Sequence, residues 1–257
     1  MNNSPISLSV IIITKNGETH LAEVLAAVRD IAAEIILVDS GSTDRTLEIA
    51  QEFNAKIYQT TVWPGFGPQK DYALSLATQD WVFGIDDDEV ISDELKESIR
   101  AAVNSNEIAA YEIDRITYFC GHWLKHGGRR PDYLVRLFPR QLGQYGHQYI
   151  HEQVQLLEDI PVKRLKGITW HYSYDKFEEV LDKLNRDSTG RAVVAFEDNK
   201  KLPCFAGILF KTFWTFLRIY IFKLGFLDGK YGFIFAIWKA EYVYYKYLKL
   251  MLMRRKS

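Results

Sequence analysis

The first hundred residues alternate between apolar runs typical of buried strands and segments with helical spacing of apolar residues. LSVIIIT (8–14) is a continuous, mostly β-branched run, the pattern of a parallel strand buried on both faces, and EIILVDS (34–40) repeats it. Strands are predicted at 8–14, 34–40, 55–60 and 80–86, and helices at 20–30, 43–53, 69–77 and 92–103. This order predicts an α/β fold with an open, mostly parallel sheet and helices on both faces.

The charge of the chain is divided unevenly along its length. The net charge is −1 over 257 residues, but residues 199–257 hold 12 Lys and Arg against two acids. The sequence therefore describes an acidic body followed by a basic, aromatic-rich tail. Two distant cysteines, Cys120 and Cys204, indicate neither a disulfide framework nor a metal site and suit a reducing compartment, and the N-terminus has no features of a signal peptide.

Polar side chains follow three of the predicted strands. They are Lys15 and Asn16 in TKNG, Asp39 after the second strand, and the run Asp86–Glu89 after the fourth. In open α/β sheets ligands bind beyond the carboxyl ends of the strands, so these groups mark a candidate site. Neither the dinucleotide fingerprint nor a P-loop occurs at the strand–helix turns, which excludes those two classes of nucleotide-binding enzyme.

The acidic run suits a hard divalent cation such as Mg²⁺ or Mn²⁺, which prefers carboxylate oxygens and substrate phosphates. On an extended segment Asp86 and Asp88 would point the same way and share one ligand, while Asp87 and Glu89 would face elsewhere. The alternative is a solvated turn before a helix whose first turn favours negative charge.

Two further residues have a binding interpretation and a structural one. Asp39 can accept hydrogen bonds from a base or a ribose, or it can cap the GSTD turn that follows it. Lys70, near the start of a predicted helix, suits a diphosphate, or it is an ordinary surface lysine.

Four motifs together resemble family 2 glycosyltransferases of GT-A fold. They are SVIIITKNGE, EIILVDSGSTDRT, GFGPQKDYAL and WVFGIDDDEVIS, in this order. HGGRRPDYLVRLFPR (126–140), YIHEQV (149–154) and ITWHYSY (168–174) are similar to one bacterial branch of that family, which adds glucose to the heptose of the lipopolysaccharide inner core. The resemblance extends through about residue 175 and continues weakly into the tail.

The resemblance implies roles for individual residues. Asp39 would bind the uracil or ribose of a UDP-sugar, Asp86 the nucleoside, and Lys70 the phosphates or the donor sugar. Asp88 would ligate the divalent metal, with His171 completing the metal or diphosphate site, and Glu152 would be the catalytic base. The branch usually has a small residue where this chain has Asp87, so the choice of metal ligand among Asp86, Asp87 and Asp88 stays open.

The other interpretations of these residues are structural. Glu152 can be a strand-edge acid, and His171 can be a core histidine beside Trp170. Four arginines, Arg129, Arg130, Arg136 and Arg140, can bind a phosphorylated acceptor bidentately, or they can pair with the acidic body.

The tail is predicted to be a helical extension, which divides the chain into a catalytic domain (1–175) and a C-terminal part (176–257). Its apolar segments are interrupted by Lys211, Arg218, Lys239 and Lys246, a pattern typical of helices that lie in a membrane interface. The alternative is a helical pair packed on the domain or on another subunit. We expect a peripheral protein on the cytoplasmic face of the inner membrane, and no nucleic-acid partner, because no recognition module is evident.

The expected function is that of a metal-dependent, inverting glycosyltransferase that moves glucose from UDP-glucose to a lipid-linked core heptose. One alternative keeps the fold but uses a polyprenyl-phosphate or another surface-polysaccharide acceptor. A second alternative is a membrane protein that binds nucleotide sugars without catalysis. The donor sugar, the acceptor hydroxyl, the preferred metal and the oligomeric state do not follow from the residues.

Overall fold

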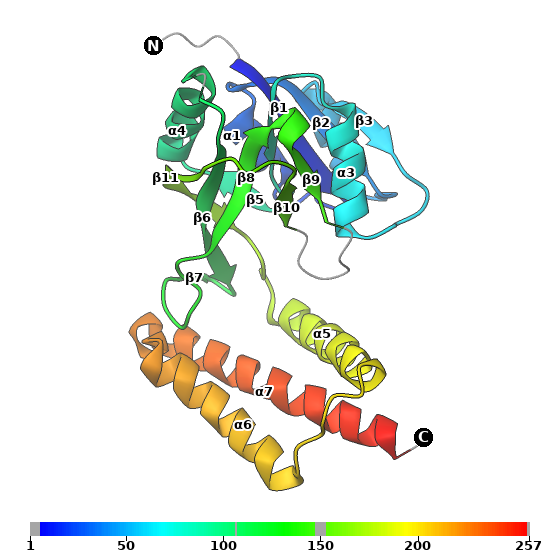
Figure 1. Ribbon diagram of the computed structural model, residues 1–257, viewed down its shortest axis with the longest axis vertical. Helices are drawn as coiled ribbons and strands as arrows, with labels where there is room; N and C mark the ends of the chain where they lie inside the picture. Colours follow the sequence, from blue (N-terminus) through cyan, green and yellow to red (C-terminus); the bar gives the residue numbers. More distant parts are fainter. Residues whose placement is uncertain (1–5, 106, 147–152, 256–257) are drawn as a thin grey trace. The chain divides into compact units, whose positions relative to one another are not determined.

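The structure is a computed structural model that describes residues 6–105, 107–146 and 153–255. It forms two compact units, one of residues 1–115 and 132–172, the other of residues 116–131 and 173–257. The first, the sheet unit, contains the candidate site, and the second, the helical unit, contains the C-terminal helices (Figure 1).

The sheet unit is built on one large mixed sheet with the strand order β3-β2-β1-β4-β8-β6-β11-β5 in the described chain. β1 (Ile6–Thr14), β2 (Ala32–Asp39), β3 (Lys56–Gln59) and β4 (Trp81–Gly84) are parallel. β8 (Tyr133–Pro139) pairs antiparallel with β4 and with β6 (Ala110–Phe119). β5 (Glu89–Ile91) pairs antiparallel with β11 (Val162–His171).

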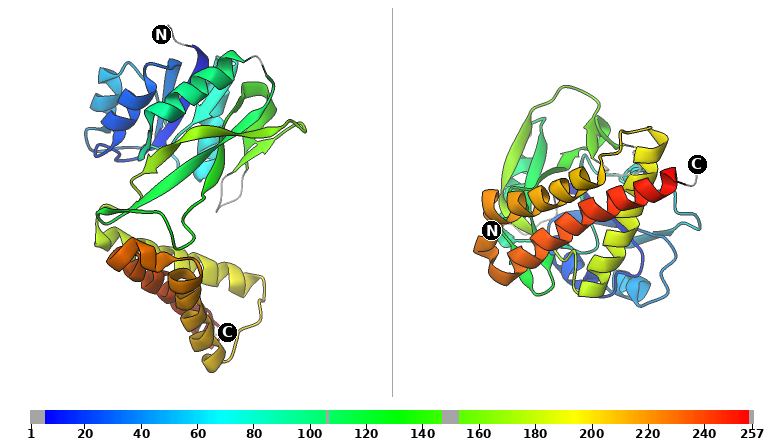
Figure 2. Two further views of the ribbon diagram at one scale, coloured as in Figure 1. Left: turned by 90° about the vertical axis from the view of Figure 1, so that its left-hand side faces the viewer. Right: turned by 90° about the horizontal axis from the view of Figure 1, so that it is seen from below.

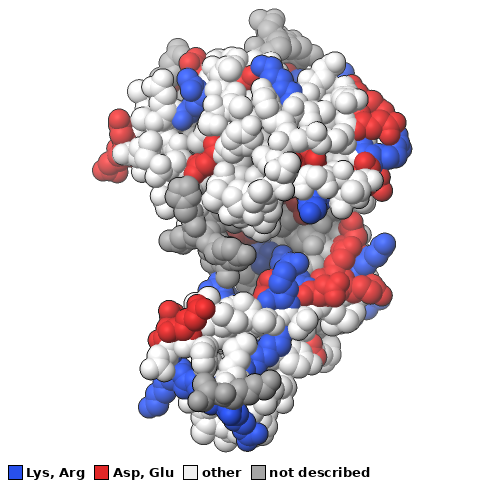
Figure 3. Space-filling model, turned by 90° about the vertical axis from the view of Figure 1, so that its right-hand side faces the viewer, with Lys and Arg blue, Asp and Glu red and all other residues white. Residues whose placement is uncertain are grey.

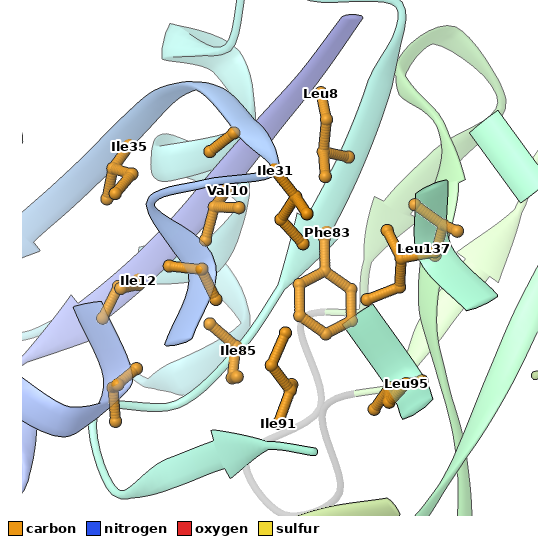
Figure 4. Close-up of a cluster of buried hydrophobic side chains, with 14 of the residues drawn as sticks. Leu8, Val10, Ile12, Ile31, Ile35, Phe83, Ile85, Ile91, Leu95 and Leu137 are labelled. Carbon is orange, nitrogen blue, oxygen red and sulfur yellow. The ribbon is translucent and has the colours of Figure 1, made fainter. Parts of the chain in front are cut away.

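Helices cover both faces of the parallel strands because the strands bury side chains on both sides. Leu8, Val10 and Ile12 of β1 pack with α1 (Leu21–Val28), α2 (Thr46–Glu52) and α4 (Asp93–Asn104), as Figure 4 shows for part of this cluster. Ile11 and Ile13 point to the opposite face and pack with α3 (Phe66–Leu76). The remaining strands of the unit, β9 (Gly143–Tyr145) and β10 (Val154–Leu156), form a separate pair.

The described residues of the helical unit form three long helices. They are α5 (Phe177–Glu197), α6 (Phe205–Leu217), which continues as a π-helical turn (Arg218–Phe222), and α7 (Gly229–Arg254). Short 3₁₀ segments lie at Arg140–Leu142 and Gly225–Asp228, and β7 (His122–Leu124) pairs with the end of β6. α6 and α7 lie side by side (Figure 2), and Phe119 packs against Phe235 and Trp238 of α7.

The predicted α/β class, with helices on both faces of an open sheet and a helical C-terminal extension, is confirmed. The structure adds an antiparallel half, made of β8, β6, β11 and β5, for which the sequence pattern predicted no strands. It also groups residues 116–131 with the C-terminal helices. The functional division at residues 175 and 176 stays a prediction.

Candidate functional site

The acidic run lies in a turn at the carboxyl edge of the sheet. β4 ends at Gly84, Asp87 and Asp88 form a turn, and Glu89 begins β5. The expectation of an extended segment, in which alternate acids point the same way, is therefore wrong. Because the chain turns here, the four acids meet four different sets of partners.

Asp86 is held between two buried cations. Its Oδ1 lies 2.7 Å from Lys70 Nζ, and its Oδ2 lies 2.8 Å from Arg136 Nη2. Burial alone would raise the pKa of Asp86, but Arg136 and Lys70 hold it well below its usual range. Asp86 is therefore ionised at neutral pH. Lys70 is 4% exposed, so the alternative of an ordinary surface lysine is excluded.

Glu89 is fully buried, and no role was predicted for it. Arg136 Nη2 donates to both of its oxygens at 2.9 and 3.0 Å, and Arg115 Nη1 donates to Oε1 at 3.0 Å. Burial raises its pKa, but Arg136 and Arg115 outweigh burial, so that the pKa is lowered. Arg115 also reaches Asp132 at 2.9 Å. The sequence signal for this network is a charged residue among apolar ones, as Arg136 in YLVRLFP of β8.

Asp87 differs from its neighbours because no Lys or Arg of the described residues pairs with it. It accepts a hydrogen bond from the hydroxyl of Thr14 at the end of β1. Burial, followed by the adjacent carboxylates Asp88 and Asp86, raises the pKa of Asp87 to about 7. Gly17 makes room for this contact, since a Cβ at that position would lie 2.5 Å from Asp87 Oδ2.

Asp88 and His171 form the pair of side chains that fits a divalent cation. Asp88 Oδ2 lies 3.2 Å from His171 Nε2, because β5 pairs with the end of β11. Two ligands on neighbouring vertices of an octahedral ion, each about 2.1 Å from it, are about 3.0 Å apart. Asp88 is 33% exposed, which leaves room for oxygens of a second molecule.

The described residues hold no group of three or more His, Cys, Asp or Glu side chains with the geometry of a metal site. Two protein ligands nevertheless suit Mg²⁺, which typically binds one or two carboxylates and completes its shell with phosphate oxygens and water. The predicted metal role of Asp88 and His171 is thus compatible with the donor set, and it stays a prediction.

Asp39 is fully buried at the end of β2 and closes its own turn. Its carboxylate accepts hydrogen bonds from Gly41 N at 3.0 Å, Ser42 N at 3.1 Å and Gln59 Nε2 at 3.3 Å. Asp39 therefore caps the turn that follows it, as the structural interpretation predicted. Binding of a base or ribose by Asp39 stays a prediction, and it would need further hydrogen bonds to the same carboxylate oxygens.

Asn16 joins the loop after β1 to the loop after β2. Its side-chain oxygen accepts from Thr43 N at 2.9 Å, and its backbone N–H donates to Ser42 Oγ at 2.8 Å. Lys15, the residue before it, is exposed at the same edge of the sheet. The two loops thus form one polar rim beside the acidic turn, and the nucleotide-binding roles of both residues stay predictions.

The predicted acceptor arginines lie in different places. Arg136 is 5% exposed inside the carboxylate cluster, so acceptor binding would require its guanidinium to leave Asp86 or Glu89. Arg129 and Arg130 belong to the helical unit, where Arg129 Nη2 donates to Thr117 Oγ1. Glu152, the predicted base, lies outside the described residues. The acceptor-binding and catalytic roles of these residues stay predictions.

The arrangement combines three chemical capacities at one edge of the sheet. Asp88 and His171 offer an oxygen and a nitrogen ligand, Lys70 and Arg136 supply buried positive charge, and the loops after β1 and β2 present backbone and side-chain polar groups. A phosphorylated ligand with a divalent counter-ion matches all three.

Comparisons with known proteins identify relatives of this chain. Residues 9–156 match the sequence model of a family described as glycosyl transferase family 2. A glycosyltransferase of Rickettsia typhi is 29% identical over 260 residues, which cover 97% of this chain and 87% of that protein. The lipopolysaccharide core biosynthesis glycosyltransferase LpsC of Rhizobium meliloti is 30% identical over 245 residues, covering 93% of this chain and 90% of LpsC.

Among solved structures, residues 1–349 of S. aureus TarS align with 97% of this chain and 92% of that chain, with 16% identity and a TM-score of 0.48. This similarity is remote, so nothing about ligands is transferred from it.

Proposed function

The chain belongs to glycosyl transferase family 2, and from that membership we propose that it moves glucose from UDP-glucose to a heptose of the lipopolysaccharide inner core. The observation that carries the proposal is the 30% identity to LpsC over nearly the whole length of both chains. The name of that relative supports a core saccharide as the acceptor. The resemblance of HGGRRPDYLVRLFPR and YIHEQV to the glucosyl-transferring branch supports glucose as the donor sugar.

The proposed donor site lies at the acidic turn. Asp88 and His171 would hold Mg²⁺ or Mn²⁺, and the bound cation would neutralise charge on the departing diphosphate. Lys70 and Arg136 keep Asp86 ionised and fixed in position, so that a carboxylate acceptor is ready for hydroxyl groups of the nucleoside. Asp39 and Asn16 stabilise the two loops that would border the nucleoside.

The proposed transfer needs one base. Glu152 would take the proton of the acceptor hydroxyl as its oxygen attacks the anomeric carbon, while the bond from that carbon to the diphosphate breaks. A single in-line displacement inverts the configuration, so an α-linked UDP-glucose would give a β-glycoside. Positive charge of Arg129 and Arg130 would suit a phosphorylated acceptor.

The test is transfer by the full chain with isolated core oligosaccharide as the acceptor. Release of UDP from UDP-glucose that depends on the acceptor, together with a β-anomeric NMR signal in the product, is the expected result. Faster release from UDP-galactose or UDP-N-acetylglucosamine would contradict the donor. Transfer only to a polyprenyl phosphate would contradict the acceptor, and no release with any donor would favour a protein that binds nucleotide sugars without catalysis.

Glu152→Gln tests the base in the same assay. We expect turnover to fall about 100-fold or more while binding of UDP is unchanged, because only proton transfer is removed. A wild-type rate in this variant would exclude Glu152 from the mechanism.

A further inference from the structure

The pair formed by α6 and α7, together with the turns that join them, exposes large apolar side chains. Phe210 is 66% exposed, Phe222 65%, Phe213 59%, Leu227 54% and Trp214 46%. The segment Phe205–Phe222 is long and apolar enough to cross a bilayer by length and composition, and 11% of its most apolar window is buried. Within the helical unit as described, no element covers these side chains. Contiguous exposure on this scale marks an interaction surface.

The same helices carry a strong excess of positive charge. Residues 205–254, which hold α6, α7 and the turns between them, contain eight Lys and Arg and two acids, and neither acid offsets the exposed cations. Asp228 is 6% exposed and accepts hydrogen bonds from Lys125 N and His126 N, and Glu241 is partly buried. Figure 3 shows Lys and Arg side chains among uncharged side chains over the helical unit, together with a group of Asp and Glu side chains. The partner of this surface is therefore expected to be both apolar and anionic.

Three of the cations share one groove with aromatic side chains. Lys211 and Arg218, seven residues apart, face Lys246 of α7 across a groove of about 250 Å³ that is also lined by Trp214, Tyr242 and Tyr247. None of the three cations forms an ion pair with a side chain in the described ranges. Burial, and then Arg191, Lys200 and Lys211, lower the pKa of Lys246, which indicates positive charge that no anion offsets.

We propose that the α6–α7 pair docks this chain on an anionic lipid bilayer, with lipid phosphates in the groove of Lys211, Arg218 and Lys246. The exposed phenylalanine and leucine side chains enter the boundary between the headgroups and the acyl chains. Lysine and arginine bind phosphate by charge-assisted hydrogen bonds, and tryptophan and tyrosine favour the interfacial depth. The inference goes beyond the proposed transfer reaction and does not depend on it.

The charges on α7 favour helices that lie in the interface over helices that span the bilayer. α6 and α7 are packed together, so a spanning α6 would bring Lys239, Glu241, Lys246 and Lys249 of α7 to bilayer depth. Charged side chains at that depth are costly, whereas an interfacial position leaves them at the headgroups.

The experiment is co-sedimentation of the full chain with vesicles of phosphatidylcholine alone and of phosphatidylcholine with 30% phosphatidylglycerol, a composition chosen to provide roughly the anionic content that attracts polybasic surfaces. We expect binding to the anionic vesicles and at least about tenfold weaker binding to the neutral ones. The triple variant Lys211→Gln, Arg218→Gln, Lys246→Gln should lose on the order of 100-fold in partition coefficient. The variant Phe210→Ser, Phe222→Ser should lose on the order of tenfold or more.

Matched variants in the sheet unit serve as controls. Arg29→Gln, Lys163→Gln, Lys166→Gln removes the same number of exposed cations, and Val62→Ser, Ile108→Ser removes two apolar side chains that are 72% and 63% exposed. Both controls should bind like the wild type. Circular dichroism of each variant establishes that it is folded.

Several results would overturn the proposal. They are equal binding to neutral and anionic vesicles, equal losses in the control and groove variants, and binding that resists extraction at high pH, which would indicate spanning helices. Light scattering that shows a stable dimer, dissociated by Phe210→Ser, Phe222→Ser and unable to bind vesicles, would assign the surface to a second copy of the chain. Loss of vesicle binding in dilute inorganic phosphate at constant ionic strength would indicate a site for free phosphate.

Discussion

Arg115 Nη1 lies 3.0 Å from Glu89 Oε1, and this contact extends the ion pairs of the acidic turn to a second, partly buried arginine. Glu89 is fully buried, so its charge is stable only while both Arg115 and Arg136 face it. The acidic turn of the predicted site is therefore held by an ion-pair network of one glutamate and two arginines, which come from three different strands.

Replacement of Glu89 by glutamine should destabilise the fold by roughly 3–5 kcal/mol, because the buried guanidinium of Arg136 and the partly buried one of Arg115 would lose their shared anion. Urea unfolding at neutral pH measures this free energy. Glu112→Gln is the matched control, because its pair with Arg164 is exposed and should contribute less than about 1 kcal/mol. Equal free energies of unfolding for the two variants would contradict the buried network.

Asp88→Asn and His171→Gln should each weaken binding of Mn²⁺ in the presence of UDP. The expected loss exceeds the roughly 10- to 100-fold that follows loss of an outer-shell partner, because a direct ligand is removed. Titration followed by the electron paramagnetic resonance of free Mn²⁺ measures the affinity without turnover. Asp93→Asn, at an exposed aspartate on α4, is the control and should bind like the wild type. Unchanged affinity in both site variants would exclude this pair as ligands.

Gly17→Ala should disturb the turn that holds Asp87. The new Cβ would lie 2.5 Å from Asp87 Oδ2 and 2.8 Å from Thr14 Oγ1, closer than real Cβ contacts allow. We expect a loss of about 1–3 kcal/mol in thermal or urea unfolding and weaker UDP binding. Gly190→Ala in α5 meets nothing within 4 Å and should instead stabilise its helix by up to about 1 kcal/mol. A neutral Gly17→Ala would show that the loop relaxes freely.

Stability should fall in acid because of Glu34, whose carboxylate joins Lys56, Ser9 and Thr78. Burial raises its pKa, but these hydrogen bonds outweigh burial and lower the pKa from 4.5 to about 2. The unfolded state therefore binds the proton more readily than the folded state. The contribution of Glu34 to the free energy of unfolding is complete above pH 4.5 and is lost as the pH falls toward 2.

The lowered pKa of Glu34 corresponds to about 3 kcal/mol in the free energy of unfolding at neutral pH. Urea unfolding of the wild type and of Glu34→Gln between neutral pH and acid measures the effect, and the variant should be less stable at pH 7 and less sensitive to acid. Glu48→Gln, at an exposed pair with Arg45, should keep the wild-type profile. Parallel profiles for the wild type and Glu34→Gln would contradict the assignment.

The parallel half of the sheet could be predicted because each of its main strands is buried on both faces. Residues 10–13 and 35–38 are therefore uninterrupted runs of aliphatic side chains, a pattern typical of a strand buried on both faces. β11 shows why the antiparallel half was missed. Its segment VKRLKGITWH carries three cations, and most of its first half is exposed, so its pattern resembles a loop as much as a strand.

The position of the acidic turn also followed from the sequence, since it comes directly after a buried strand. Its internal pairings did not follow, because Arg115 and Arg136 lie on strands 26 and 47 residues further along the chain than Glu89. Arg136 was assigned to the acceptor for the same reason. Arg136 stands among apolar residues in YLVRLFP, which signals burial, but the sequence does not show which carboxylates its guanidinium meets.

The chain passes between its two units after Arg115, after Pro131 and after Tyr172. A chain shortened after Tyr172 would keep Phe119 and Leu124 but lose the helices whose side chains bury them. The two ends of the segment 116–131 nevertheless lie close together, because Arg115 N donates to Asp132 O at 3.1 Å. A minimal sheet unit would therefore lack two segments: residues 116–131, replaced by a tight hairpin, and the residues after Tyr172. The helical unit is built from these two segments together.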